Sequence, residues 1–283
     1  MIDETIAEIR EMQTHSSSVV AVKATRALSE LVDREFATVE EFDRALQQNA
    51  GALRRANPSH ASLHNAMREV LAAVPGETET VEQAKERLAA TIEHVVEEVE
   101  TGKRRAAAET AATLEDGETF MTHDYSSTVL DAVHRAVESE GVELTAYVTE
   151  ARPRYLGRKA ARELGAIDGV DVHLLVDGAS SLFLDECDRI LIGMDCIVGD
   201  TLYNRVGTYP LAATAAQLDV PVAVAGSGTK IIEDGFRFEN ELRPPYEVML
   251  EPVEGVVLEN PAYDATPTAL LDEGITDDGR RGF

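Results

Sequence analysis

The stretch GMDCIVGDTLYNRVGTYPLAATAAQLDVPVAVAGSGTK, residues 193–230, joins a buried strand, a polar loop, a helix and a second strand. Asp195 lies just after the apolar run 190–192, where that strand ends. Four residues lead into the helix predicted over residues 208–218: Asn204, Arg205, Gly207 and Thr208. The N–H groups and positive dipole end of such a helix face the crevice in which open α/β sheets bind ligands. The stretch therefore predicts an α/β protein with an anion-binding site at the start of this helix.

Short apolar runs alternate with helical segments throughout the C-terminal part of the chain. The predicted strands cover residues 119–122, 143–149, 172–176, 189–194, 220–225 and 255–258, and the predicted helices cover residues 127–138, 156–164, 180–184 and 208–218. This alternation is typical of a mostly parallel sheet with helices on both faces. No G-x-G-x-x-G motif follows the first strand, so the usual dinucleotide-binding fold is not supported.

The N-terminal part of the chain has a helical pattern instead. From Ile2 to about Leu114, apolar residues recur at spacings of three and four, and no strand pattern interrupts them. Turn residues at 57–58, 75–76 and 101–102 predict helix ends. We therefore expect four or five helices, of which the segment 80–113, with a bend near Gly102, is the longest.

The composition restricts the class of partner. The chain has 283 residues, 44% of them hydrophobic, and a formal net charge of −26. Length and apolar content predict a globular protein with a substantial core. An acidic surface disfavours nucleic acid and acidic membranes as partners. Because the acidic residues are spread along the whole chain, we interpret them as an adaptation to a very salty cytoplasm.

The cysteines indicate a reducing compartment. Cys187 and Cys196 are the only two, and neither a signal peptide nor a long apolar run is present. We therefore expect a cytoplasmic protein without a membrane span. Two cysteines without further ligands do not make a zinc site, so we interpret them as core residues and expect neither a metal nor a cofactor.

The polar residues that follow the strands are expected to gather at one edge of the sheet, because the carboxyl ends of parallel strands share an edge. The group comprises His123, Asp124, Ser126, Ser127, Arg152, Asp195, Asn204, Arg205 and Lys230. Its cations and backbone donors suit one or two phosphate groups. Structural roles stay open: salt bridges for Arg152 and Lys230, a buried carboxylate that orients Asn204 for Asp195, and packing for His123.

Several motifs of the C-terminal half occur in the order found in one protein family. They are Thr122-His123 with Tyr125-Ser126-Ser127, Glu150-Ala151-Arg152-Pro153 with Gly157, then Asp195, Asp200, the run 204–208, Lys230, and NPAYDATP at 260–267. The chain thereby resembles the translation initiation factor 2B alpha/beta/delta family, which includes isomerases of ribose 1,5-bisphosphate and methylthioribose 1-phosphate, and looks like a member from a halophilic archaeon. The resemblance implies an N-terminal helical domain, residues 1–117, and a Rossmann-like α/β domain with a mostly parallel sheet, residues 118–283.

The resemblance also implies which residues form the site. In the isomerases a cysteine follows the Thr-His pair and works with the aspartate that corresponds to Asp195, whereas this chain has Asp124 there. Two close carboxylates can share a proton, which raises one pKa, so an enzyme would use Asp195 and Asp124. The implied ligand-binding residues are His123, Ser126, Ser127, Arg152, Asn204, Arg205, Gly207, Thr208 and Lys230.

Departures from the isomerase pattern favour a non-catalytic or regulatory protein that binds a sugar phosphate or nucleotide phosphate. Besides Asp124, the chain has Ser16-Ser17-Ser18-Val19 in place of Arg-Gly-Ala and Asn57-Pro58-Ser59 in place of Arg-Pro-Thr. The alternative is a sugar-phosphate aldose–ketose isomerase of the ribose-1,5-bisphosphate type, and a third interpretation is an assembly partner with a vestigial pocket. The resemblance implies a homodimer or higher homo-oligomer, with no membrane or direct nucleic-acid partner.

Overall fold

The computed structural model describes residues 1–11, 17–58, 60–76, 78–232, 236, 238–240, 242–251 and 253–283. Ser16 and Ser59, at which the chain departs from the isomerase pattern, lie outside the described residues. The chain divides into two compact units, unit 1 from Met1 to Gly102 and unit 2 from Lys103 to Phe283.

Helices form unit 1, as their apolar spacing predicts. They are α1 (Ile2–Arg10), α2 (Ser17–Ala27), α3 (Glu30–Asp33), α4 (Val39–Ala56), α5 (Ala61–Ala73) and the first part of α6 (Val81–Ala111). Their apolar stripes bury one core that includes Leu28, Phe42, Leu63, Met67 and Leu88. The predicted helix end at residues 101–102 is wrong, because Gly102 is buried within α6 and the helix continues beyond it.

A seven-stranded sheet organises unit 2, in the order β11-β10-β7-β4-β1-β2-β3. The strands are β1 (Thr119–His123), β2 (Leu144–Thr149), β3 (Val170–Leu175), β4 (Arg189–Gly193), β7 (Val222–Ala225), β10 (Glu273–Thr276) and β11 (Gly279–Gly282). All neighbours are parallel except β10 and β11. The predicted α/β class with a mostly parallel sheet is therefore confirmed, although β10 and β11 were not predicted.

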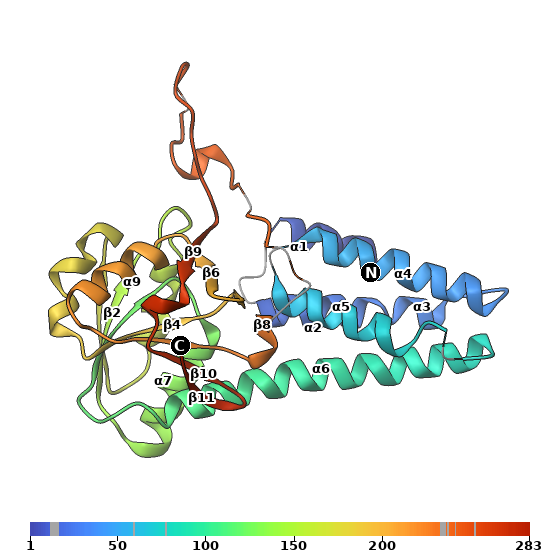
Figure 1. Ribbon diagram of the computed structural model, residues 1–283, viewed down its shortest axis with the longest axis horizontal. Coiled ribbons are helices and arrows are strands. Elements are labelled where there is room, and N and C mark those ends of the chain that lie inside the picture. Colours follow the sequence, from blue (N-terminus) through green and yellow to red (C-terminus); the bar gives the residue numbers. More distant parts are fainter. Residues whose placement is uncertain are drawn as a thin grey trace. The chain divides into compact units, whose positions relative to one another are not determined.

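Helices cover both faces of this sheet (Figure 1). Strand residues alternate between two cores, so that Leu191 packs with α7 (Ser127–Glu140) and α8 (Leu156–Leu164), while Ile190 and Ile192 pack with α9 (Thr208–Gln217). The helix predicted over residues 180–184 is wrong. Two short 3-10 segments, η1 (Asp177–Leu182) and η2 (Leu184–Glu186), occupy this part of the chain.

A second, four-stranded sheet contains part of the opening stretch. It has the order β8-β5-β6-β9, from β5 (Cys196–Val198), β6 (Thr201–Arg205), β8 (Ile231–Ile232) and β9 (Tyr263–Pro267). The predicted polar loop is therefore a hairpin of β5 and β6, which pair antiparallel. Gly199 and Asp200 form the turn between these two strands, of which β5 has only three residues.

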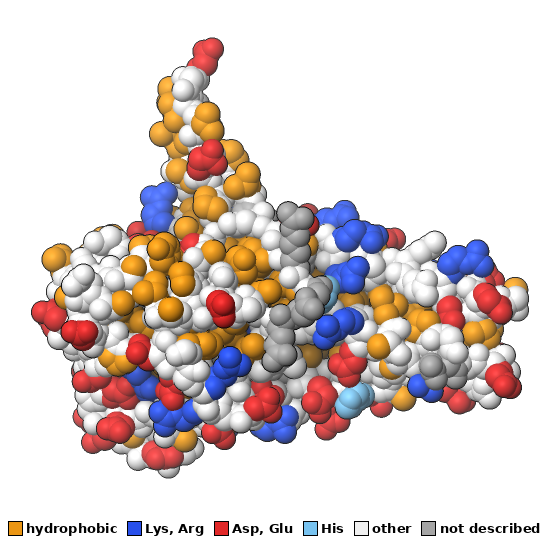
Figure 2. Space-filling view, viewed as in Figure 1, with side chains coloured by type: hydrophobic (Ala, Val, Ile, Leu, Met, Phe, Trp, Pro, Cys, Tyr) orange, Lys and Arg blue, Asp and Glu red, His pale blue; other side chains and the backbone are white. Residues whose placement is uncertain are grey.

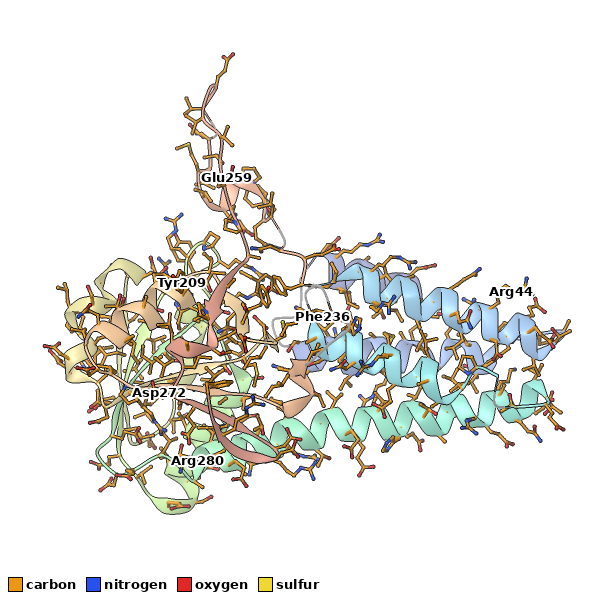
Figure 3. The ribbon with its side chains drawn as sticks, viewed as in Figure 1. Arg44, Tyr209, Phe236, Glu259, Asp272 and Arg280 are labelled. Atoms are coloured by element: carbon orange, nitrogen blue, oxygen red, sulfur yellow. The ribbon has the colours of Figure 1, made fainter. Side chains whose placement is uncertain are left out.

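Between β8 and β9 the chain makes an irregular excursion, which we name the arm and define as residues 242–251 and 253–261. Its two ends are joined by a bridge between Leu242 and Pro261 and by the Arg243 N–H, which donates to the Asn260 carbonyl at 2.7 Å. Its regular structure is the 3-10 turn η4 (Pro245–Glu247). The strand predicted over residues 255–258 is wrong, because these residues leave the sheet and Val257 is 82% exposed. In Figure 3, Glu259 lies on the returning side of the arm.

None of the helices in the described ranges combines the length and the apolar character that crossing a bilayer requires.

Candidate active site

The carboxyl ends of β1, β2, β4 and β7 lie along one edge of the main sheet, since these strands are parallel. Asp124 follows β1, Arg152 follows β2, Asp195 follows β4 and Lys230 follows β7. Arg205, the last residue of β6, contacts two of these groups. Residues far apart in sequence therefore meet where ligands bind in open α/β sheets.

Backbone strain is concentrated at the same edge. Asp124, Ala151 and Tyr155 have positive φ values of 64°, 56° and 58°, which are unusual for residues other than glycine. Gly207 has a φ of 112°, and a Cβ atom there would lie 2.6 Å from the imidazole of His123. Strained residues cluster at ligand-binding and catalytic sites because the surrounding packing must maintain them.

The two predicted catalytic carboxylates share one guanidinium group. Arg205 Nε lies 3.4 Å from Asp124 Oδ2 and 3.9 Å from Asp195 Oδ2. The Arg205 side chain is only 10% exposed, and its Cζ lies 4.6 Å from the centre of the Tyr263 ring. The Tyr263 ring and the two carboxylates therefore hold the Arg205 guanidinium between Asp124 and Asp195.

The environment of Asp124 raises the proton affinity of its carboxyl group. Burial raises the pKa of Asp124, and the Asp195 charge raises it further. Arg205 and His123 oppose this increase but do not cancel it. A carboxyl with a raised pKa next to a second carboxyl is one arrangement that can perform general acid–base chemistry.

Asn204 and Lys230 hold the end of β4. The Asn204 side chain donates to the Gly193 carbonyl at 3.1 Å, and Lys230 Nζ donates to the Met194 carbonyl at 2.7 Å. Backbone carbonyls that leave a sheet ladder need other donors. These two buried side chains supply them and so position the next residue, Asp195. Burial also lowers the pKa of Lys230.

His123 is buried, and the protein contacts both of its ring nitrogens. Nδ1 lies 2.7 Å from Thr149 Oγ1, and Nε2 lies 2.9 Å from the Val206 carbonyl, to which it donates. The imidazole thus joins β1, β2 and the segment before α9. The structure places this predicted ligand-binding residue beside the site, with its polar atoms directed to protein groups.

A protein carboxylate occupies the start of α9, where the sequence predicted an anionic ligand. Asp264 Oδ2 accepts the N–H groups of Gly207 and Tyr209 at 2.8 and 3.0 Å. Thr208 donates its hydroxyl to the Arg205 carbonyl at 2.8 Å. Asp264 lies on β9, within the NPAYDATP run, and sequence spacing did not reveal this contact. The one sequence feature that could have indicated this contact is the presence of an acidic residue, Asp264, in that run.

The remaining predicted ligand-binding residues lie around the same edge. Ser126 caps α7 by accepting the Val129 N–H, and Ser127 is the first residue of that helix. Arg152 donates to the carbonyls of Glu247 and Val248 in the arm, both at 3.3 Å. Sequence reasoning missed Arg154 and Arg243, which line a cavity with Asp124, Arg152 and Arg205. Their signal was weak because isolated arginines are common on surfaces.

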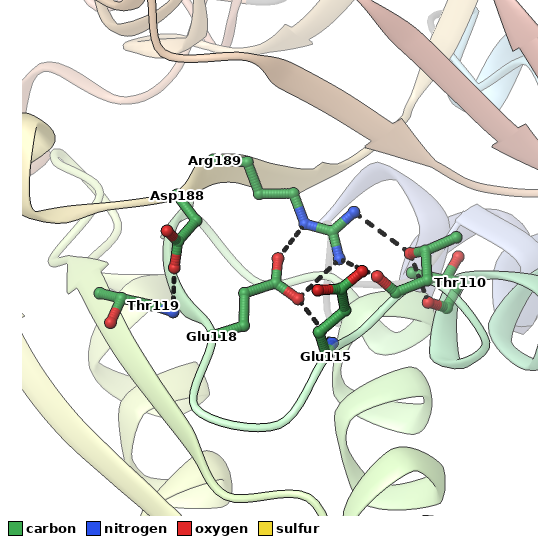
Figure 4. A network of polar contacts seen from close by, with 7 residues as sticks. Thr110, Glu115, Glu118, Thr119, Asp188 and Arg189 are labelled. Atoms are coloured by element: carbon green, nitrogen blue, oxygen red, sulfur yellow. Dashed lines mark hydrogen bonds and ion pairs between the residues drawn. The ribbon is translucent and has the colours of Figure 1, made fainter.

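The polar network at the opposite edge of the sheet has a structural role (Figure 4). Arg189 Nε contacts Glu118 Oε1 at 2.5 Å, and Arg189 also donates to the Thr113 carbonyl at 3.0 Å. Asp188 accepts the Thr119 N–H at 2.8 Å. Arg189 and Glu118 are paired at the amino ends of β1 and β4, at the opposite edge from the candidate site. Across the described part of the chain, no group of three or more His, Cys, Asp or Glu side chains is arranged to hold a metal ion.

Comparison with known proteins gives consistent matches over nearly the whole chain. Residues 13–281 match the model of the Initiation factor 2 subunit family. A ribose 1,5-bisphosphate isomerase of Haloterrigena turkmenica is 34% identical, with 98% of this chain and 88% of that protein covered. The Haloferax volcanii protein of the same name is 31% identical over 99% of this chain and 88% of its own length. A crystal structure described as Pyrococcus horikoshii translation initiation factor eIF-2B has a TM-score of 0.83 and 25% identity, and covers 99% and 96% of the two chains.

These relatives correct one expectation from the sequence. The preferred interpretation, a non-catalytic or regulatory protein, is wrong, because six relatives that are 29–34% identical over nearly the full chain are named as isomerases. An aspartate at the position of the cysteine does not by itself exclude catalysis. A carboxyl with a raised pKa can exchange protons as a thiol does.

Proposed function

Because the chain belongs to the initiation factor 2 subunit family, we propose that it is a sugar-phosphate isomerase that converts ribose 1,5-bisphosphate into the corresponding 2-ketose. The observation that carries this proposal is the pair Asp124 and Asp195, both within 3.9 Å of Arg205 Nε. The names of the relatives support the choice of substrate.

The proposed reaction moves one hydrogen and opens the sugar ring. The C1–O4 bond breaks, its electron pair stays on O4 and O4 gains a proton. The hydrogen on C2 moves to C1 with its bonding electron pair, so C1 is reduced and C2 is oxidised, and the C2 hydroxyl loses its proton to become a carbonyl. Asp124, with its raised pKa, serves as the acid that protonates O4. Asp195, held in place through Asn204 and Lys230, accepts the C2 hydroxyl proton. Arg205 stabilises whichever carboxylate is charged at each stage.

Turnover of ribose 1,5-bisphosphate at high salt, followed by NMR of the ketose carbonyl carbon, tests this proposal. We expect turnover by the wild type, and at least a hundredfold loss in Asp195→Asn, the usual scale for removal of an acid–base group. Arg162→Met is the matched control, because Arg162 is exposed on α8. A folded wild-type protein that leaves ribose 1,5-bisphosphate unchanged, or an Asp195→Asn variant with full activity, would contradict the proposal.

We further propose that the chain forms a homodimer through the arm. Figure 2 shows hydrophobic side chains along this segment. Large apolar residues are exposed there, among them Leu242, Tyr246, Leu250, Val253 and Val257. Contiguous apolar surface of this kind marks association sites. Because the acidic chain disfavours nucleic acid and anionic lipid, a second copy of the same apolar segment is the partner that fits.

Analytical ultracentrifugation at high salt tests the dimer. We expect Leu250→Glu with Val257→Glu to shift the protein to monomers, because two buried carboxylates would lose their hydration. A double change on the exposed face of unit 1, Glu97→Gln with Glu98→Gln, is the control. A monomeric wild-type protein, or an arm variant that remains dimeric, would contradict the proposal that the arm forms the dimer interface.

A further inference from the structure

The second sheet places an aromatic ring directly opposite Arg205. Arg205 on β6 pairs with Tyr263 on β9 in the antiparallel register, so the two side chains lie on one face of this sheet. The Tyr263 ring contacts the guanidinium, with Arg205 Cζ 4.6 Å from the ring centre, and Tyr263 is only 1% exposed. Because protein packs around the ring, Tyr263 can affect the two carboxylates through its contact with Arg205.

Two further aromatic residues pack beside the Tyr263 ring. Tyr203 lies two residues before Arg205 on β6 and therefore on the same face of the second sheet. Phe238 stacks on Tyr203, with ring centres 4.1 Å apart, and meets Tyr263 edge to face at 5.3 Å. Aromatic pairs in these geometries are stabilising beyond the area that they bury. We name Tyr203, Phe238 and Tyr263 the aromatic layer, and its packing restricts the ring that contacts Arg205.

The backbone of Tyr263 is held as well, by a side chain from the segment that leads into the arm. Asn240 Oδ1 accepts the Tyr263 N–H at 3.2 Å, and Asn240 Nδ2 donates to the Tyr263 carbonyl at 2.8 Å. The next residue, Asp264, accepts two N–H groups from the start of α9. Contacts on successive residues of β9 therefore fix the place from which the Tyr263 ring reaches Arg205.

The position of the Arg205 guanidinium decides how strongly its charge acts on each carboxylate. Its Nε lies 3.4 Å from Asp124 Oδ2 and 3.9 Å from Asp195 Oδ2. Charge interactions depend on distance, and more steeply where water is excluded, as it is around this 10% exposed side chain. An arginine side chain has several rotatable bonds, and an aromatic face attracts its cation. The Tyr263 ring therefore favours the orientation that keeps both carboxylates within reach.

We propose that Tyr263 is a positioning residue of the isomerase, whose ring holds the Arg205 guanidinium between Asp124 and Asp195. The inference rests on the proposed function and adds a residue to that same site. In the proposed reaction Asp124 becomes a carboxylate when it gives its proton to O4, and Arg205 stabilises this charge. A charge that is already in place stabilises the transition state more than one that must first be oriented. We therefore expect kcat, rather than KM, to depend on the Tyr263 ring.

Carboxyl carbon NMR titration of Asp124, together with turnover of ribose 1,5-bisphosphate, tests this role. In Tyr263→Leu the pKa of Asp124 should rise, because Arg205 lowers this pKa and would spend less time beside the carboxyl. We expect kcat to fall about three- to thirtyfold, the scale of a cation–π contact, with KM nearly unchanged. Tyr263→Phe keeps the ring and should retain both the pKa and kcat. Phe120→Leu, which removes a ring from the core of unit 2, is the matched control, and thermal melting verifies that each variant is folded.

A second background separates the position of Arg205 from other effects of the lost ring. In Arg205→Met, adding Tyr263→Leu should not move the pKa of Asp124 any further, because the ring acts through the guanidinium. An equal shift with and without Arg205 would assign the change to water that enters beside Asp124, and would overturn the role of Tyr263. An unchanged pKa in Tyr263→Leu, or equal changes in the Leu and Phe variants, would overturn it too. If the expected pKa changes occur in a protein without turnover, the isomerase fails and the placement of Arg205 by Tyr263 stands.

Discussion

At the scale of single residues, Asp124 has neighbours of both signs. Asp195 raises its pKa and Arg205 lowers it, in addition to the larger effect of burial. Removing either neighbour should therefore move the pKa of Asp124 in a known direction.

We predict opposite shifts in two variants. In Asp195→Asn the like charge is lost, so the pKa of Asp124 should fall, whereas in Arg205→Met the cation is lost and the pKa should rise. Carboxyl carbon NMR titration of labelled aspartate measures both values, with Asp124→Asn to assign the signal. Asparagine suits the positive φ of this position. Shifts of the same sign in both variants would contradict the proposed environment of Asp124.

The two cysteines give a second prediction at this scale. Burial raises the pKa of Cys187 to about 12. Burial also raises the pKa of Cys196, and the Asp195 charge raises it further. Because the thiolate is the reactive form, neither cysteine should react with a disulfide reagent at pH 8 in the folded protein. Both should react in denaturant, which serves as the control. Fast reaction of either thiol in the native protein would contradict this prediction, because it would show that the thiol is accessible.

At the scale of elements, α9 depends on a carboxylate from a distant strand. Asp264 on β9 accepts two N–H groups from the first turn of α9, so helix and second sheet stabilise each other. Tyr209, on that turn, is exposed, and Figure 3 labels it.

We predict that Asp264→Ala lowers the free energy of unfolding by about 0.5–2 kcal/mol, the usual effect of losing a helix cap. Asp264→Asn keeps an acceptor oxygen and should lose less. Denaturant unfolding at constant salt measures both variants. If Asp264→Ala is as stable as the wild type, the contact does not hold the helix start.

At the scale of the whole molecule, the net charge of −26 governs the response to salt. Like charges repel across an acidic surface, and salt shortens the range of this repulsion from about 10 Å at 0.1 M to about 3 Å at 1 M. We predict that Tm rises with KCl over this range. Thermal melts in KCl, compared with melts at a pH near the acidic isoelectric point, test the cause. Near the isoelectric point the rise in Tm with KCl should be much smaller, because most of the net charge is lost. An equal rise in Tm at both pH values would contradict charge repulsion as the cause.

The fold class, and the sheet edge that carries the candidate site, could both be predicted from sequence patterns. Apolar runs alternating with helical segments are typical of a parallel sheet covered on both faces. Parallel strands bring Asp124, Arg152, Asp195 and Lys230 to one edge. Helix length was less predictable, since Gly102 lies inside α6, where buried packing offsets the weak helix propensity of glycine.

The three-dimensional contacts were needed to tell the polar groups that hold the fold from those that line the cavity beside Asp124. Asp264 occupies the start of α9, and Asn204 and Lys230 hold the end of β4. Arg154 and Arg243, which are far apart in sequence, join Arg205 beside Asp124. Local periodicity reports which face of an element is buried. The partner of each polar atom depends instead on contacts between distant segments, which the sequence pattern does not encode.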